Sequence, residues 1–223
     1  MDRRTFLWIV AGGIWLAAIP SGTGHGEPFA DDKKAAPSRE RPLITGRDGK
    51  SLHIYTETNG RRFGTANPHW GVVYKDGELA DKAILKAFCT PLAFHDGLVQ
   101  IGARPGNDLA AGSEGSSTTG ERLIVTASLP GVGDEIPLGR IFRDSGGKDF
   151  VIRFGGNRKA AREEGTGCIM CLESCWVGIT SNAAYPLISG FRRFMRPNSS
   201  FKGNTELLSA SESQPVILTY RPA

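Results

Sequence analysis

Three of the four cysteines of this 223-residue chain lie close together in the sequence. Cys168, Cys171 and Cys175 form a C-x2-C-x3-C array, whereas Cys89 lies far earlier. Such close spacing makes the three sulfur atoms neighbours whatever the backbone conformation, and a shared metal or exchange between thiols needs that proximity. The array therefore predicts sulfur chemistry at one place in the fold.

An iron–sulfur cluster is the first interpretation of the array, because such clusters usually take four cysteine thiolates. The spacing resembles the end of the bacterial ferredoxin pattern C-x2-C-x2-C-x3-C-P. The first cysteine of that pattern is absent, and Trp176 stands in place of the proline. We expect a 4Fe–4S cluster on Cys168, Cys171 and Cys175, with Cys89 as a fourth ligand.

Two other interpretations of the cysteines stay open. The four residues can form disulfides, since an exported protein meets an oxidising compartment. Alternatively, Cys168 and Cys171 form a redox-active C-x-x-C pair, or the set binds zinc or copper. The disulfide interpretation requires no cofactor at all.

Residues near the array are candidates for shaping the site. We expect Gly165 and Gly167 to let the backbone turn sharply, so that its N–H groups face sulfur or another anion. Asn182 and Tyr185 are candidates for lining a bound cofactor. Basic residues flank the array and either stabilise thiolates and dock an acidic redox partner or form a solvated face; they are Arg158, Lys159, Arg162, Arg192, Arg193 and Arg196.

The histidines of the predicted domain are weaker candidates, because a lone histidine is more often structural than a ligand. His69 beside Trp70 and His95 on a predicted helix are stronger than His53. The chain has no G-x-S-x-G nucleophile elbow and no complete G-x-G-x-x-G dinucleotide pattern.

The N-terminal residues 1–26 predict an export signal that is cleaved. Arg3 and Arg4 precede an apolar stretch, Phe6 to Ile19, that is too short for a stable membrane span. Arg3-Arg4-Thr5-Phe6-Leu7 favours the twin-arginine route, although Asp2 and Trp8 depart from that pattern. The predicted location is the periplasm. The twin-arginine route exports proteins that are already folded, so it is suited to a protein whose cofactor is inserted in the cytoplasm before export.

Composition bounds the remaining architecture. The 29 glycines and 13 prolines favour many turns and a strand-rich chain. The net charge of +4 comes without a dense basic stripe, so no nucleic-acid partner is expected. Residues 27–42 are polar and charged and predict a flexible linker. Residues 43–223 then predict one α+β domain, rich in strands, with one or two short helices and long Gly-rich loops.

Local patterns place the elements of this domain. Leu52, Ile54 and Thr56 alternate with more polar residues, which is typical of a strand. Asp76-Gly77 indicates a hairpin or a tight turn. Thr90 as N-cap, Pro91 at the first position and Gly102 as terminator predict a helix between them. A Gly/Ser/Thr-rich loop follows at 106–120, and other strands are expected at 70–74, 83–88, 123–129, 150–154 and 216–220.

Several sequence blocks occur in a distinctive order: Trp70-Gly71-Val72-Val73-Tyr74, Leu79-Ala80-Asp81-Lys82-Ala83, Leu98-Val99-Gln100-Ile101-Gly102-Ala103-Arg104-Pro105-Gly106-Asn107, Arg153-Phe154-Gly155-Gly156-Asn157, and Gly165-Thr166-Gly167-Cys168 continuing to Ser181-Asn182-Ala183-Ala184-Tyr185. In these blocks the chain resembles the YdjY domain family of bacterial exported proteins. The resemblance implies a ferredoxin-like or iron–sulfur protein. Cys89 is not part of the family pattern, so the resemblance leaves the fourth ligand to another side chain, water or a partner molecule.

The sequence thus predicts a periplasmic protein that binds an iron–sulfur cluster or another metal and transfers electrons to a periplasmic redox partner. It is not expected to be an enzyme in its own right. One alternative is a disulfide-stabilised binding module whose 106–120 loop contacts a ligand. Another is a thiol redox protein that uses Cys168 and Cys171. The oligomeric state is left open.

Overall fold

The computed structural model describes residues 36–107, 109–188 and 201–223. The predicted export signal, most of the predicted linker, and Arg192, Arg193 and Arg196 lie outside the described residues. Within the described ranges, no helix is long and apolar enough to cross a membrane.

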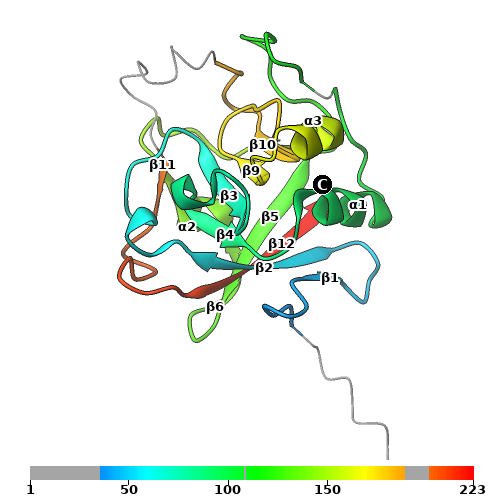
Figure 1. The fold of residues 1–223 in the computed structure, drawn as a ribbon. Coiled ribbons are helices and arrows are strands. Elements are labelled where there is room, and N and C mark those ends of the chain that lie inside the picture. Colours follow the sequence, from blue (N-terminus) through cyan, green and yellow to red (C-terminus); the bar gives the residue numbers. More distant parts are fainter. Residues whose placement is uncertain (1–35, 108, 189–200) are drawn as a thin grey trace, which may run out of the picture. The chain divides into compact units, whose positions relative to one another are not determined.

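Most of the described chain folds around one large sheet (Figure 1). Its strands follow in the order β6 (Gly133–Pro137), β5 (Leu123–Leu129), β12 (Pro215–Pro222), β2 (Leu52–Thr58), β4 (Leu85–Ala87), β3 (Trp70–Tyr74), β9 (Cys168–Cys171), β10 (Thr180–Asn182) and β8 (Ile152–Phe154). A short strand, β1 (Leu43–Thr45), also pairs with β2. Separately, β7 (Phe142–Asp144) pairs with β11 (Phe201–Gly203). The pairs β3–β4 and β9–β10 are parallel, and the other pairs are antiparallel.

The large sheet curls back on itself. An isolated bridge joins Arg153 of β8 to Arg122, the residue just before β5. Next to it, the Phe154 N–H donates to the Glu121 carbonyl at 2.9 Å. The strand at one end of the sheet therefore meets the second strand from the other end.

Three short α-helices are found among the described residues: α1 (Pro91–Gln100), α2 (Leu138–Ile141) and α3 (Arg158–Glu163). Single 3-10 turns occur at η1 (Gly60–Arg62) and η2 (Ala80–Lys82). Helix α1 has the predicted ends, since the Thr90 side chain accepts a hydrogen bond from the Ala93 N–H at 3.2 Å and Gly102 follows with φ +88°. It packs beside α3 (Figure 1). The chain is strand-rich as predicted, with more helices than the one or two expected.

The predicted strands are present, with ends that differ by a few residues from the expected ones. The residues predicted for β5 are the observed ones. The Asp76-Gly77 pair forms a tight turn, with the Gly77 N–H donating to the Tyr74 carbonyl at 2.9 Å. No hairpin follows, because η2 intervenes and returns the chain so that β4 runs parallel to β3. Residues 109–120 contain no helix or strand, as expected for the loop.

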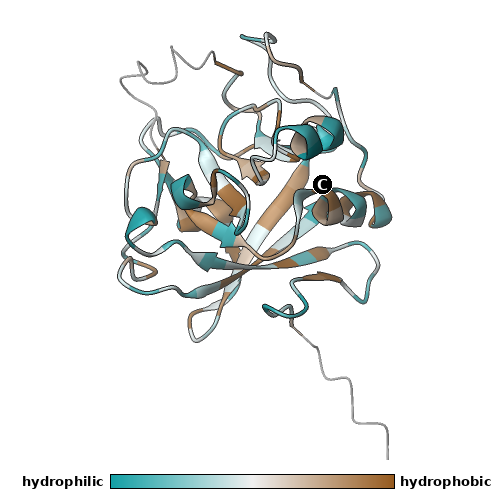
Figure 2. Cartoon of the chain, viewed as in Figure 1, coloured by the Kyte–Doolittle hydropathy of each residue, from teal (hydrophilic) through white to brown (hydrophobic). Residues whose placement is uncertain are grey.

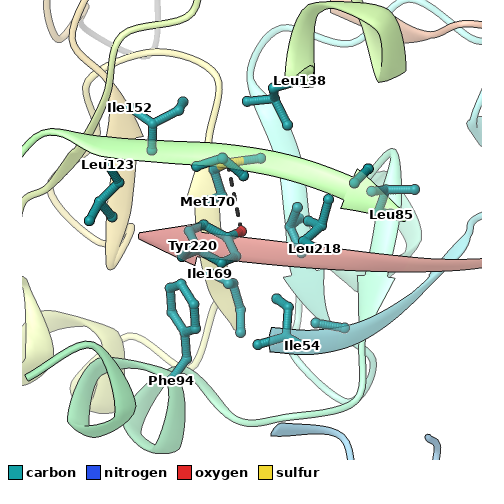
Figure 3. Packing of buried hydrophobic residues seen from close by; sticks show 14 of the residues in the cluster. Ile54, Leu85, Phe94, Leu123, Leu138, Ile152, Ile169, Met170, Leu218 and Tyr220 are labelled. Atoms are coloured by element: carbon teal, nitrogen blue, oxygen red, sulfur yellow. Dashed lines mark hydrogen bonds between the residues drawn. The ribbon is translucent and has the colours of Figure 1, made fainter. Parts of the chain in front are cut away.

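Apolar residues lie mostly on the strands and on α1, while many connecting loops are polar (Figure 2). The main core joins residues from most strands of the sheet to α1 (Figure 3). There Phe94 of α1 packs edge-to-face on Tyr220, with ring centroids 4.8 Å apart, and the Tyr220 hydroxyl contacts the Met170 sulfur at 3.9 Å. A second, smaller core cluster, called here the cysteine cluster, contains Val73, Ala80, Ala83, Cys168, Cys171, Cys175 and Val177.

Candidate metal centre

A β-bulge in β9 sends two cysteines to the same face of the sheet. Val72 pairs with Met170, but the next residue, Val73, pairs with Cys168, so β9 holds one extra residue at this point. In a regular strand, residues three positions apart point to opposite faces. With the extra residue, Ile169 and Met170 both enter the main core, and Cys168 and Cys171 both enter the cysteine cluster.

Gly71 makes a second irregularity in the same strand pair. Trp70 pairs with Cys171 and Val72 with Met170, so β3 has the extra residue here. A side chain at Gly71 would place its Cβ 2.9 Å from Leu172 Cγ and 3.0 Å from the Met170 carbonyl oxygen. Any side chain at this position would therefore force Leu172 or the two strands to shift. Just beyond, the Leu172 N–H donates to the His69 carbonyl at 2.7 Å.

The three clustered sulfur atoms lie together. The Cys171 thiol is in hydrogen-bond contact with the thiols of Cys168 and Cys175. A ring nitrogen of His69 joins them, since the ligand atoms of His69, Cys171 and Cys175 all lie within 4.8 Å of one another. No more than 2 % of any of these four residues is exposed. All four cysteines are buried thiols, and no disulfide joins them in the described residues.

Electrostatics disfavours a bare thiolate at this place. Contact with the Cys168 and Cys175 thiols, followed by burial, raises the pKa of Cys171 well above its ordinary value. Without a cation, Cys171 is therefore a neutral thiol at neutral pH. A metal ion reverses this preference, because a coordinating thiol loses its proton to the metal's charge.

The sequence indicated His69 only weakly, and the structure gives it a defined position. The Asn67 side-chain oxygen accepts hydrogen bonds from the His69 and Trp70 N–H groups, at 2.9 and 2.8 Å, and so fixes the entry into β3. The His69 ring also packs against the Trp70 ring, with centroids 4.6 Å apart. Its position just before a strand that pairs with the cysteine strand is a topological feature that the sequence does not reveal.

The chain after the array wraps closely around the sulfur atoms. The buried Asn157 side chain donates to the carbonyls of Cys175 and Gly178, both at 2.8 Å. A Cβ at Gly178 would lie 2.9 Å from the Cys171 sulfur. Asn157 therefore holds the turn, and Gly178 lets the backbone pass close to the Cys171 sulfur.

Ser181 adds a polar group beside Cys171. The two residues are paired in the parallel β9–β10 ladder, and a Cβ at Gly178 would lie 3.3 Å from the Ser181 hydroxyl as well as close to the Cys171 sulfur. This hydroxyl is fully buried and has no hydrogen-bond partner among the described residues. Buried hydroxyls nearly always have an acceptor. A metal-bound thiolate at Cys171 would provide one.

Cys89 is not brought into the cysteine cluster. It belongs to the main core with Leu85 and Ala87. The three residues are spaced two apart along β4 and its continuation, so their side chains lie on the same face. Because alternate residues of a strand share one face, the sheet separates Cys89 from the other three sulfur atoms. Burial raises the pKa of the Cys89 thiol to about 12, and no other cysteine contributes to that shift.

The two glycines before the array serve the packing of two turns. Gly165 and Gly167 have φ of +62° and +79°. A Cβ at Gly77 would lie 2.6 Å from the Gly167 Cα. The Gly167 carbonyl accepts from the Tyr74 N–H at 2.8 Å, so the turn before β9 is fixed against the turn after β3.

Asn182 and Tyr185 use their polar atoms away from the sulfur atoms. The Asn182 oxygen accepts from the N–H groups of Val151 and Ala184, and its amide donates to the Leu172 carbonyl at 3.2 Å. The Tyr185 hydroxyl donates to Asp144 at 2.5 Å, and its ring packs on Phe201. Asn182 thus holds the backbone that follows Cys171, whereas Tyr185 belongs to the main core.

Within the described part of the basic flank, Arg158 joins two helices. Arg158 forms two hydrogen bonds with Asp96, at 2.9 and 3.0 Å, and so joins α3 to α1. Contact with Arg158, and then with His95, lowers the pKa of Asp96 to about 2. His95 packs against the Phe154 ring and is not among the candidate ligands.

Comparison with known proteins now places the chain. The YdjY domain profile matches residues 43–221. The chain belongs to the YdjY domain family. It is 34% identical over 181 residues to the uncharacterized protein YdjY of Escherichia coli (strain K12). The matched region covers 81% of this chain and 79% of that relative. No solved structure matches the chain. The YdjY domain includes all three clustered cysteines and His69.

Proposed function

We propose that this YdjY protein binds a single thiophilic metal ion through Cys168, Cys171, Cys175 and His69, after export to the periplasm. The observation that carries the proposal is a buried group of ligand atoms: those of His69, Cys171 and Cys175 lie within 4.8 Å of one another, and the Cys168 thiol contacts the Cys171 thiol. Three cysteines and a histidine are a common ligand set of structural zinc sites, which are closed and four-coordinate. The nearly complete burial of all four residues fits such a closed site.

The spacing of the ligand atoms supports one ion rather than a larger cluster. With zinc–sulfur bonds of about 2.3 Å, tetrahedral geometry separates two ligand sulfurs by about 3.8 Å. The ligand atoms of His69, Cys171 and Cys175 lie within 4.8 Å of one another, which needs little adjustment. A 4Fe–4S cluster inserts eight atoms between its ligands, so it requires a wider arrangement. We therefore expect zinc. Zinc has no redox chemistry, so an electron-transfer role would require iron or copper at this site.

The thiol redox alternative has less support. A reactive cysteine needs a lowered pKa and access to its substrate. The Cys171 thiol has a raised pKa and is fully buried. A buried, mutually hydrogen-bonded set of thiols is better suited to holding a metal than to attacking a disulfide.

The test is the metal content of the mature protein, purified from the periplasm without chelators and under anaerobic conditions. We expect about one zinc ion per chain, no acid-labile sulfide and no visible absorption. Detection of iron together with acid-labile sulfide would show that the site holds an iron–sulfur cluster and not a single ion. Absence of metal together with disulfides in the intact mass would overturn the proposal.

Two cysteine variants provide a matched pair for the same measurement. Cys175→Ser removes a proposed ligand, and we expect loss of the bound metal. Cys89→Ala removes a buried thiol from the main core, and the metal content should remain that of the unmodified protein. Equal loss of metal in both variants would show that Cys89 is a ligand and contradict the proposed set.

A further inference from the structure

A second candidate site lies where the large sheet curls back on itself, and it is independent of the metal proposal. A hollow of about 420 Å³ is lined there by Arg104, Arg122 and Arg153, together with Pro105, Gly120 and Glu121. Three arginines and one glutamate thus line it. The excess of positive charge gives the hollow an electrostatic preference for anions.

Two of these arginines, Arg122 and Arg153, have no carboxylate partner among the described residues. Arg122 and Arg153 stand opposite each other in the antiparallel bridge that joins β8 to the segment before β5. Like charges directly opposite on neighbouring strands destabilise a sheet. The Arg122 guanidinium makes no hydrogen bond or ion pair with any residue that the structure describes.

The two other arginines are partly engaged. Arg153 donates to the Gly120 carbonyl at 2.8 Å, and Arg104 pairs with Glu121 at 3.1 Å. Each of these contacts uses one N–H group, and a guanidinium carries five in a planar fork that matches a carboxylate or phosphate. N–H groups therefore remain on all three arginines for an anion.

A larger hollow of about 570 Å³ adjoins this one and shares Arg122 with it. Its lining includes Phe142, Phe150 and Ile124, and Ile124 is 51% exposed although it is large and apolar. Asp144 and Asp149 also line it, but Asp144 accepts hydrogen bonds from Tyr185 and from backbone N–H groups. Volumes of this order are typical of small-molecule sites, which are mostly apolar with a few polar groups.

We propose that the two hollows together bind an amphipathic carboxylate. Its acidic group would lie between Arg122 and Arg153, and its apolar chain or ring would cover Ile124 and Phe150. Binding relieves the repulsion between the opposed arginines and removes exposed apolar surface from water, so both halves of the ligand contribute.

The test compares two probes, octanoate and acetate, by calorimetry and backbone NMR on the full mature protein. We expect octanoate, below its micelle concentration, to bind roughly 100-fold more tightly than acetate, because methylenes are buried. Arg122→Gln and Arg153→Gln should each weaken octanoate binding about tenfold, as expected for loss of a charged hydrogen bond. Arg61→Gln, an exposed arginine on η1, is the matched control and should bind as the unmodified protein does.

A second readout separates binding from general damage. Because Arg122 faces a like charge, Arg122→Gln should raise the unfolding temperature of the ligand-free protein at low salt. Octanoate affinity that is the same in Arg122→Gln and Arg61→Gln would overturn the proposal. Equal affinity for acetate and octanoate would overturn the apolar half of the site, and with it the amphipathic ligand.

Discussion

Ser181 is the residue whose substitution tests the metal centre most directly without removing a ligand. Its buried hydroxyl lies beside Cys171 and has no partner among the described residues. A donor to a metal-bound sulfur orients the ligand, and loss of such outer contacts costs about 10–100-fold in metal affinity. We expect Ser181→Ala to lower the affinity within that range, measured by competition with a chromophoric chelator.

The control for this variant is Thr118→Val. The Thr118 hydroxyl is also buried without a partner in the described residues, but Thr118 is not paired with Cys171 in the sheet, and its N–H donates to the Ser174 hydroxyl at 2.9 Å. Its replacement should leave metal affinity unchanged. If Ser181→Ala binds the metal as tightly as Thr118→Val does, the hydroxyl does not donate to Cys171.

Titration of the buried thiols gives a second residue-scale prediction, which concerns Cys89. Burial raises the pKa of this thiol to about 12, whereas the pKa of a cysteine in an unfolded chain is about 8.5. Because the folded pKa is the higher one, the stabilisation from the neutral thiol is fully present below the unfolded pKa. It is then lost as the pH rises toward the folded pKa.

The measurement is the free energy of urea unfolding of the metal-free protein at several pH values, compared with Cys89→Ala. We expect the stability advantage of the unmodified protein over the variant to shrink as the pH rises from about 8.5 to 10. An advantage that stays constant over this interval would show that the Cys89 thiol is not buried in the folded chain.

At the residue scale, the sequence predicted that the three clustered cysteines lie together, but it favoured Cys89 over His69 as their neighbour. Spacing alone makes Cys168, Cys171 and Cys175 neighbours, so no knowledge of the fold was needed. The choice between Cys89 and His69 depends on which face of the sheet each side chain occupies and on the pairing of β3 with β9. Those are long-range properties that one sequence does not contain.

At the scale of elements, the close approach of β3 and β9 depends on Gly71. A Cβ at this position would meet Leu172 and the Met170 backbone at distances that the strands cannot relieve without moving. We expect Gly71→Ala to destabilise the protein by about 1–3 kcal/mol, as overpacking usually does, and to weaken metal binding because β9 shifts. Thermal unfolding and metal affinity measure the two effects.

Gly139→Ala is the matched control, because a Cβ there would meet only Phe150, at 3.9 Å, and Gly139 lies in α2. That change should be neutral or slightly stabilising, since it reduces the freedom of the unfolded chain. A Gly71→Ala variant as stable as Gly139→Ala would contradict the close packing of the two strands.

Local signals explain why some elements were predicted and others were not. Thr90, Pro91 and Gly102 act through neighbouring residues, so the ends of α1 can be read from the sequence. The strand β9 was not predicted, because its four residues are all buried and show no alternation of apolar and polar side chains. Its bulge arises from its pairing with β3, which is distant in the sequence. The positive φ of Gly165 and Gly167 agrees with the sharp turn expected there, but the packing of Gly167 against Gly77 is a long-range contact that the sequence does not show.

At the scale of the whole molecule, the proposed metal ties together segments that are distant in the sequence. His69 precedes β3, Cys168 and Cys171 lie in β9, and Cys175 lies in the turn that Asn157 holds. A ligand that binds only the folded state stabilises it by about 4 kcal/mol when its concentration is 1,000 times the dissociation constant. Metal removal should therefore lower the stability of the entire described fold rather than loosen one loop.

Refolding the protein from urea with and without a strong chelator measures this effect, because a buried ion exchanges slowly in the folded state. We expect the chelator to lower the unfolding midpoint of the unmodified protein, and zinc added in excess to restore it. Cys175→Ser should already have the lower midpoint and should respond to neither reagent, since its site is incomplete. A midpoint that the chelator leaves unchanged in the unmodified protein would mean that β3 and β9 are held together by backbone pairing and packing alone.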